Sequence, residues 1–421
     1  MISKPKGTYD LYGQKAKQRQ YLDDVLASIC EKYNYEYIKT PVFEASEVFH
    51  RSVGIDSDIV SKETYDFKDR GNRNLTLRPE GTAAIVRSYI ENKMFGDPKQ
   101  PKKLFYNANM YRYERPQAGR LREFSQFGVE LLGSDDVFAD AEVISLAYNI
   151  FKILGLKNIK VNLNTLGDEE SRKNYREALI KHFTPHINTM CEDCQKRLLN
   201  NPLRILDCKV DNNHETMQTV PNILDYLNDE SKNRFLKLQE YLDLLEVEYE
   251  VNPGIVRGLD YYNHTVFELE LVNENFGRSN ILCAGGRYNN LVEKLDGPQT
   301  PAVGFAAGLE RILLALEEEK VNIPINDSID IYLGYVNEEE KETALYLTQE
   351  LRLNGFICET EYLGRSLKSQ FKSADRLNAK YIIILNSDDL KDYQVKVKDN
   401  KTKEEQKVAI NDLVDYFDMH M

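Results

Sequence analysis

Residues 105–133 read FYNANMYRYERPQAGRLREFSQFGVELLG. Apolar and aromatic residues flank a polar, glycine-containing centre, which predicts a strand, a loop and a second strand. The segment carries four arginines and three glutamates. Arginines on a rigid hairpin can bind phosphate oxygens through two nitrogens while carboxylates orient the guanidinium planes. An exposed hairpin with surface ion pairs is the alternative, and the charge pattern alone does not separate the two.

The hairpin lies within a region of mixed helices and short strands. The predicted helices are 14–33, 136–154 and 308–320, and the predicted strands are 249–252, 266–271 and 281–284. Residues 168–247 interrupt this pattern with highly charged helical segments punctuated by prolines. We therefore predict an α+β domain around a sheet, with a helical insertion at about 168–247.

A regular alternation follows the polar, proline-containing segment 322–328. Strand and helix patterns succeed one another at 329–335, 338–353, 356–361, 366–377 and 381–385. This β-α-β-α-β series predicts a small sheet covered by helices. A chain of 421 residues is too long for one core, so we expect one domain over 1–325 and a second over 326–421.

Composition places the chain among folded globular proteins, with 42% hydrophobic and 29% charged residues. Residues 1–13 lack the apolar core of a secretory signal, and no apolar run approaches the length of a membrane span. The six scattered cysteines do not form the pattern of a disulfide framework. We expect a cytoplasmic protein with no membrane partner.

The net charge of −13 argues at first against a nucleic-acid ligand. Residues 365–380, however, carry five basic residues against the single acid Asp375. Their spacing of three or four predicts one cationic helix face, for which a solvated surface is the alternative.

Three further stretches combine glycine with charged or aromatic residues. They are Leu77–Thr82, Val256–Thr265, and the pair Ala284–Tyr288 and Gly304–Arg311. Each is weak alone, because adjacent tyrosines often only pack and glycines often only permit strand–helix packing. Together they could form a polar pocket with aromatic walls and close backbone approach.

The order of these stretches resembles the signature motifs of class II aminoacyl-tRNA synthetases. Residues 40–44 resemble motif 1, 105–133 motif 2 and 301–314 motif 3, while 257–267 resemble the peptide peculiar to histidyl-tRNA synthetases. The opening Lys6–Asp10 and the closing domain match as well. The resemblance covers nearly the whole chain, and the insertion matches less clearly.

The resemblance implies a fold and a set of partners. The expected architecture is a class II antiparallel sheet flanked by helices, with a C-terminal α/β anticodon-binding domain. The expected assembly is a homodimer through motif 1, with Pro41 at the interface. The expected substrates are L-histidine, ATP with Mg²⁺ and the histidine tRNA, and no prosthetic group is expected.

The resemblance also implies residue roles. Catalytic roles fall to Arg112, Arg257 and Arg311. The implied histidine-binding residues are Glu80, Gly81, Thr82, Arg112, Gln126, Glu130, Arg257, Tyr261 and Tyr262. The implied ATP-binding residues are Arg112, Glu114, Arg120, Phe124 and Arg311. Glu130 is the expected acceptor for the imidazole N–H, and Gly285 with Gly286 the expected floor of the pocket.

The insertion contains Cys191 and Cys194, which are separated by two residues, followed by Cys208 and His214. These residue types can bind zinc, although the second half is loosely spaced. The resemblance requires no metal, so packed or solvent-facing thiols are the favoured interpretation and zinc the alternative.

A regulatory protein of the same fold is the alternative function. It would be a catalytically inactive, synthetase-like subunit of ATP phosphoribosyltransferase. Such paralogues lack the C-terminal domain and lose motif residues, whereas this chain retains Arg112, Arg257 and Arg311.

Overall fold

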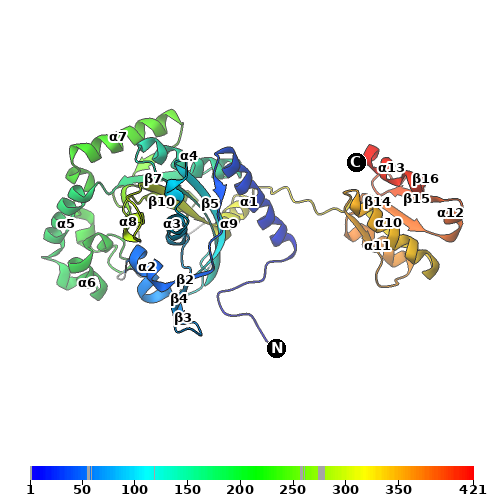
Figure 1. Cartoon of the computed structure of the whole chain (residues 1–421), viewed down its shortest axis with the longest axis horizontal. Helices are drawn as coiled ribbons and strands as arrows, with labels where there is room; N and C mark the ends of the chain where they lie inside the picture. The colour runs from blue at the N-terminus through cyan, green and yellow to red at the C-terminus, as the bar shows by residue number, and fades with distance from the viewer. Residues whose placement is uncertain are drawn as a thin grey trace. The chain divides into compact units, whose positions relative to one another are not determined.

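The computed structural model describes residues 2–54, 57, 59–117, 119–256, 259, 261–273 and 280–421. The chain forms two compact units, Met1–Ile323 and Pro324–Met421. Each unit has its own sheet, and each is considered by itself below (Figure 1).

An eight-stranded sheet forms the centre of the first unit, in the order β1-β5-β6-β11-β10-β9-β7-β8. In that order the strands are Glu36–Tyr37, Lys102–Tyr111, Glu123–Leu132, Ala302–Gly308, Ile281–Arg287, Asn263–Leu271, Ile159–Thr165 and Tyr249–Val251. The six central strands pair antiparallel, and only the short edge strands β1 and β8 pair parallel. The predicted antiparallel sheet in an α+β domain is confirmed.

Alternating side chains of the central strands serve two different cores. Phe105 and Phe127 face the core shared with α1, α4, α7 and α9, whereas Leu104 and Tyr106 face the core shared with α3, α5, α6 and α8. This period of two is the signature of a sheet buried on both faces. These helices span Gly13–Lys32 (α1), Thr82–Glu91 (α3), Val137–Ile153 (α4), Glu169–Phe183 (α5), Glu192–Asn200 (α6), Asp229–Leu244 (α7), Leu291–Lys294 (α8) and Leu309–Glu318 (α9).

The predicted insertion consists of α5, α6 and α7 joined by short 3-10 turns, and the three helices lie together at one side of the first unit (Figure 1). Asp168 caps α5 and Asn228 caps α7, each accepting a backbone N–H of its own helix. The two caps also bond to each other, with Asn228 Nδ2 2.7 Å from Asp168 Oδ2. This contact ties the first and last helices of the insertion together where both begin.

A small sheet stands beside the main one, in the order β2-β4-β3. Its strands are Phe43–Ala45 (β2), Asn74–Leu77 (β4) and Tyr65–Lys68 (β3). Helix α2, at Ser46–Val53, follows β2, and a π-helical turn at Ile59–Glu63 precedes β3. Arg78 follows β4 and donates to the carbonyls of Thr40, Pro41 and Asn109. One buried guanidinium therefore joins the segment containing Pro41 to β5.

The second unit is a five-stranded sheet in the order β13-β12-β14-β15-β16. Its elements are β12 Ile331–Tyr335, α10 Lys341–Leu353, β13 Cys358–Thr360, α11 Leu367–Arg376, β14 Tyr381–Leu385, α12 Ser387–Lys391, β15 Gln394–Asp399, β16 Glu405–Ala409 and α13 Leu413–His420. The predicted β-α-β-α-β series is present, with β12 parallel to both neighbours. The final β15–β16 hairpin was not predicted, because lysines occupy its outward positions and dilute the strand pattern.

The expected cationic helix face is shorter than the sequence suggested. Helix α11 ends at Arg376, so Arg365 and Lys380 lie outside it. Arg365 pairs with the carboxylate of Glu361, and Lys380 Nζ lies 2.8 Å from Asp330 Oδ1. Lys368, Lys372 and Arg376 remain exposed on successive turns of α11.

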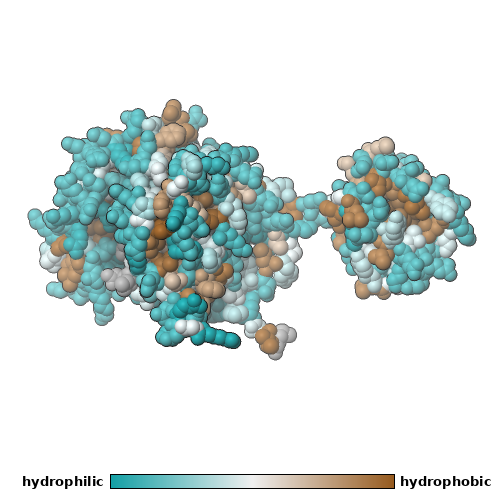
Figure 2. Space-filling model, in the orientation of Figure 1, coloured by the Kyte–Doolittle hydropathy of each residue, from teal (hydrophilic) through white to brown (hydrophobic). Residues whose placement is uncertain are grey.

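Hydrophilic residues cover most of the face of the first unit seen in Figure 2, with apolar residues between them. Across the described ranges, none of the helices has the length and apolar character needed to traverse a bilayer.

Candidate active site

A cavity of about 310 Å³ opens on the face of the main sheet that carries Tyr106 and Glu130. Strands β6, β10 and β11 form its base, and the hairpin loop and the first turns of α3 and α9 complete it. The predicted residues that line it are Glu80, Thr82, Arg112, Glu114, Arg120, Phe124, Gln126, Glu130, Tyr261, Tyr262 and Arg311. Segments far apart in sequence thus converge on one space.

One end of the cavity is acidic and buried. Glu130 is 1% exposed, and its carboxylate accepts hydrogen bonds from the hydroxyls of Thr82, at 2.7 Å, and Tyr288. Burial, opposed by these two bonds, raises the pKa of Glu130 to about 8. A protonated or proton-sharing carboxyl therefore faces the cavity near neutral pH.

Glu80 lies beside this group at the start of α3. Its two carboxylate oxygens accept the backbone N–H groups of Thr82 and Ala83, at 2.7 and 2.9 Å. Burial raises the pKa of Glu80 even though these bonds and the charge of Arg112 favour ionisation. The carboxylate caps the helix and keeps lone pairs available for a cation in the cavity.

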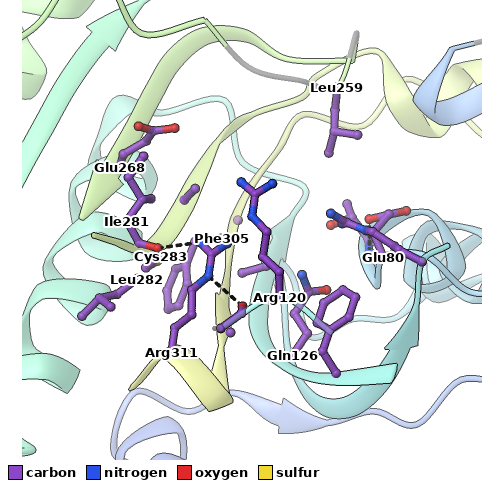
Figure 3. A pocket seen from close by; sticks show the side chains of 18 of the residues that line it. Glu80, Arg120, Gln126, Leu259, Glu268, Ile281, Leu282, Cys283, Phe305 and Arg311 are labelled. Carbon is purple, nitrogen blue, oxygen red and sulfur yellow. Dashed lines mark hydrogen bonds between the residues drawn. The ribbon is translucent and has the colours of Figure 1, made fainter. Parts of the chain in front are cut away.

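The other end of the cavity is cationic. Figure 3 shows Arg120 between Arg311 and Glu80, with Arg311 and Glu80 on opposite sides of the cavity. Arg311 donates to the carbonyls of Gly119, at 3.2 Å, and Ile281, at 2.9 Å. Burial first, and then the charges of Arg120 and Arg112, lower the pKa of Arg311. An anion placed here would relieve this repulsion.

Arg112 lies between the two ends. Its Nε donates to the carbonyl of Pro79 at 2.8 Å, and its guanidinium lies 5.3 Å from the centre of the Phe124 ring. Glu114 lies 3.7 Å from Arg120, which orients that arginine within the hairpin loop. The hairpin of residues 105–133 is therefore a site wall and not merely an exposed pair of strands.

The N-terminal segment braces the same hairpin. The backbone N–H of Arg122 donates to the carbonyl of Gly7 at 2.9 Å. Tyr9 donates its hydroxyl to Glu310 at 2.9 Å, and Glu310 also accepts the backbone N–H of Ser125. Burial, with the charge of Glu310, raises the pKa of Tyr9 to about 12, so this hydrogen bond persists through the physiological range.

The prediction that Gly285 and Gly286 form the floor of the cavity is wrong, because neither residue lines it. A Cβ at Gly285 would lie 2.3 Å from the carbonyl oxygen of Gly304, and one at Gly286 would lie 2.5 Å from that of Thr265. These glycines permit close strand packing, and the described glycines of this sheet that line the cavity are Gly304 and Gly308. A Cβ on Gly304 would lie 2.0 Å from Glu130 Oε2, so glycine there makes room for the carboxylate.

Two tyrosines of the site were missed at the sequence level. Tyr288 donates to Glu130, and Tyr106 donates to Gln126 Oε1 at 3.2 Å. The Tyr106 ring lies where a Cβ on Gly81 or Gly128 would stand, so Gly81 acts by admitting this ring. The strand alternation of Tyr106 with buried Phe105 could have indicated that Tyr106 faces the cavity side.

Two further predicted residues are Arg257 and Pro41. Arg257 lies outside the described residues, although Leu259, Tyr261 and Tyr262 line the cavity. Pro41 is exposed and lies away from the cavity, next to exposed Val42 and Phe43.

A second cavity of about 630 Å³ adjoins the first and shares Arg112, Glu114, Arg120 and Arg311 with it. Its other wall comes from the insertion and includes Cys191, Arg197, Arg204 and Cys208. The predicted cysteines Cys191, Cys194 and Cys208 lie together, and Asp211 joins them.

The central antiparallel sheet carries an arginine hairpin and leads into a helix with an arginine in its first turn, which fits the architecture of a class II aminoacyl-tRNA synthetase. The family model described as histidyl-tRNA synthetase matches residues 7–312, and that of an anticodon binding domain matches 322–419. The chain belongs to the histidyl-tRNA synthetase family.

Relatives match over the full length. The histidine–tRNA ligase of Anoxybacillus flavithermus is 52% identical over 98% of this chain and 97% of its own. That of a Geobacillus species is 50% identical over the same shares. The crystal structure of apo S. aureus histidyl-tRNA synthetase is 42% identical, with a TM-score of 0.86 over 99% of this chain and 100% of that chain. These relatives favour the synthetase over the regulatory subunit of ATP phosphoribosyltransferase.

Proposed function

We propose that the chain activates L-histidine with ATP to give histidyl-adenylate and then transfers the histidyl group to the 3′ end of the histidine tRNA. The observation that carries this proposal is a single cavity with buried carboxylates at one end and an arginine cluster at the other. The acidic end suits an ammonium and an imidazole, and the cationic end suits a polyphosphate. Catalysis is assigned to residues 1–325 and anticodon binding to 326–421.

The first step forms a bond between a carboxylate oxygen of histidine and the α-phosphorus of ATP, and breaks the bond to the departing pyrophosphate. The carboxylate is already ionised at neutral pH, so the step needs no general base. It needs positioning and compensation of negative charge. Arg112 and the proposed Arg257 would act at the α-phosphate, and Arg311 with Arg120 along the phosphate tail.

Histidine is held by the acidic end in this proposal. Glu130 shares a proton with the imidazole, and Tyr262 is a second partner. Glu80, Thr82 and Gln126 bind the α-ammonium group. A competitor without polar side-chain atoms would give Glu130 no hydrogen-bond partner on the substrate, and such a mismatch can reduce activity by about 10⁴–10⁵.

ATP enters as its magnesium complex, since Mg²⁺ binds phosphate oxygens and neutralises part of their charge. Phe124 is assigned to the adenine and Glu114 to the same nucleotide, with no prosthetic group required. In the second step a terminal ribose hydroxyl attacks the carbonyl carbon of the adenylate and AMP leaves. A phosphate oxygen of the substrate is the proposed proton acceptor.

A homodimer in the cytoplasm is part of the proposal. Val42 and Phe43, next to Pro41, are 41% and 50% exposed, and Phe43 packs edge-on against exposed Phe67. An apolar surface of this kind favours burial against a second copy. All six cysteine thiols are free, which fits a reducing compartment.

The anticodon-binding role gives a prediction for α11. Lys368→Glu combined with Lys372→Glu is expected to raise the KM for tRNA at least about tenfold and to flatten its salt dependence, because two phosphate contacts are lost. Histidine-dependent ATP–pyrophosphate exchange should not change. Lys341→Glu with Lys391→Glu is the matched control, since these exposed lysines lie on α10 and α12, which pack with the core on the other side of the sheet from α11. An unchanged KM in the α11 variant would contradict an RNA-facing α11.

Amino-acid-dependent ATP–pyrophosphate exchange tests the function as a whole. Each of the twenty amino acids is offered in turn to the purified chain, and only histidine is expected to support exchange. Arg257→Ala should abolish most of that exchange if this arginine bridges the two substrates. Folded protein that exchanges with no amino acid would overturn the proposal in favour of a regulatory role.

A further inference from the structure

Three cysteines and one aspartate of the insertion converge on a point outside the catalytic cavity. Cys191, Cys194, Cys208 and Asp211 each offer one ligand atom, and these atoms all lie within 4.8 Å of one another. Cys194, Cys208 and Asp211 are buried and Cys191 is half-buried. Nothing in the proposed reaction uses this cluster.

The spacing of the ligand atoms fits a tetrahedral metal ion. Cys191 Sγ lies 3.7 Å from Cys208 Sγ, and Cys208 Sγ lies 3.7 Å from Asp211 Oδ2. Two sulfurs that each lie about 2.3 Å from one zinc ion are about 3.8 Å apart. A disulfide would require about 2.05 Å, so these thiols stand at ligand distance and not at bonding distance.

The same ligand spacing occurs twice in the sequence. Cys191 and Cys194 are separated by two residues, and so are Cys208 and Asp211. Cys191 is the N-cap of α6, so the first pair stands at the positive end of that helix.

We propose that Cys191, Cys194, Cys208 and Asp211 bind one zinc ion that holds the insertion together. Three thiolates and a carboxylate suit Zn²⁺ and not the oxygen-seeking Mg²⁺ or Ca²⁺. Four protein ligands fill a tetrahedral shell and leave no position for a substrate, so the ion is structural. Arg197, Arg204 and Lys209, together with Asp193 and Asp207, line the adjoining cavity wall.

Asp211, and not His214, completes the ligand set. His214 Nδ1 lies 2.9 Å from Thr216 Oγ1 and Nε2 lies 3.1 Å from Thr189 Oγ1, so both ring nitrogens have other partners. Asp211 also accepts the backbone N–H of Cys191 at 3.0 Å, which joins the two halves of the site. The sequence drew attention to His214 because histidine is a commoner zinc ligand than aspartate.

The ion would fix one wall of the second cavity. The chain between Cys194 and Cys208 contains most of α6 and the 3-10 turn Pro202–Ile205. Arg197 and Arg204 on these elements face the same cavity as Arg112 and Arg120. Metal binding therefore determines how the insertion presents its cations next to the phosphate-binding end of the active site.

Elemental analysis of the purified full-length chain tests the proposal. We expect about one zinc per chain and, after exchange for Co²⁺, thiolate-to-cobalt charge-transfer and tetrahedral d–d bands. Cys208→Ser and Asp211→Asn should weaken zinc binding by more than the 10–100-fold typical when a partner of a ligand is lost. His214→Ala and Cys358→Ala are matched controls and should keep the full zinc content.

A second measurement avoids reliance on variants that fold poorly. Removing zinc from the wild-type chain with a chelator should lower its Tm and expose three more thiols to a thiol reagent, and added Zn²⁺ should reverse both changes. A wild-type chain that holds no zinc, even after incubation with one equivalent, would overturn the proposal. Loss of zinc in His214→Ala, or a disulfide between Cys191 and Cys208 in the freshly isolated protein, would also overturn it.

Discussion

Arg311→Ala is expected to reduce kcat/KM for ATP in histidine-dependent pyrophosphate exchange by about 10³-fold. The guanidinium is held by two backbone carbonyls and crowded by Arg120 and Arg112. Because these donors are placed before ATP arrives, the site does not have to reorganise when charge moves onto the pyrophosphate. A fall in kcat together with a rise in KM for ATP is expected, since the tail is bound in both the ground state and the transition state.

Arg311→Lys separates charge from geometry. Lysine retains the positive charge but cannot bond both carbonyls and a phosphate in one plane, so it should restore only part of the lost activity. Arg73→Ala is the control, because Arg73 is exposed on the small sheet and pairs with Asp69. If Arg311→Ala folded normally and kept its kcat/KM for ATP, the assignment of this end of the cavity to the phosphates would be wrong.

Much of the fold could be predicted from the sequence, because the strongest patterns involve residues that are close together in the chain. Helix α4 begins one residue after Asp136, where a helix was predicted to begin, and α5 begins one residue after Asp168, where the helical insertion was predicted to begin. An N-cap side chain satisfies the first free N–H groups of a helix, so it is visible in the sequence. The hairpin of residues 105–133 was equally readable, because two apolar runs surround one glycine-containing loop.

The site was only partly readable, because its properties depend on long-range contacts. Glu130 was named as a ligand, but its raised pKa depends on burial by the fold, and its hydroxyl partner Tyr288 lies 158 residues away in the sequence. Arg287 follows two glycines and is charged, yet it is fully buried and paired with Asp140 of α4. Asp211 is an ordinary acid until the fold brings it to three cysteines. No local pattern encodes such partners.

Glu130→Gln is expected to lower kcat/KM for histidine by about 10²–10³-fold and to leave KM for ATP unchanged. Thr82 and Tyr288 donate to different oxygens of Glu130, so the glutamine oxygen can accept from one hydroxyl while the amide NH2 donates to the oxygen of the other. Glutamine cannot share a proton with the imidazole, and loss of one partner of a buried charge-assisted pair typically costs about 2–5 kcal/mol. A variant with normal histidine activation would remove Glu130 from the specificity pocket.

The same substitution should stabilise the empty protein near neutral pH. The pKa of Glu130 is raised from its ordinary 4.5 to about 8 on folding. The unfolded chain therefore releases this proton above about pH 4.5, while the folded chain keeps it until about pH 8. Stability is fully present below about pH 4.5 and falls as the pH rises toward 8, by roughly 3 kcal/mol at pH 7.

Glutamine does not ionise, so this loss is absent from the variant. Denaturant unfolding at pH 7 should show Glu130→Gln to be the more stable protein, and the difference should shrink as the pH approaches 4.5. Thr348→Val, a substitution in the buried core of the second unit, is the control that should show no such pH dependence. Equal pH profiles for the wild type and Glu130→Gln would mean that Glu130 is ionised in the empty pocket. The Glu130 carboxyl thus destabilises the empty protein and still recognises the substrate. Such a loss of stability is expected at a binding site whose ligand can share the proton of the carboxyl group.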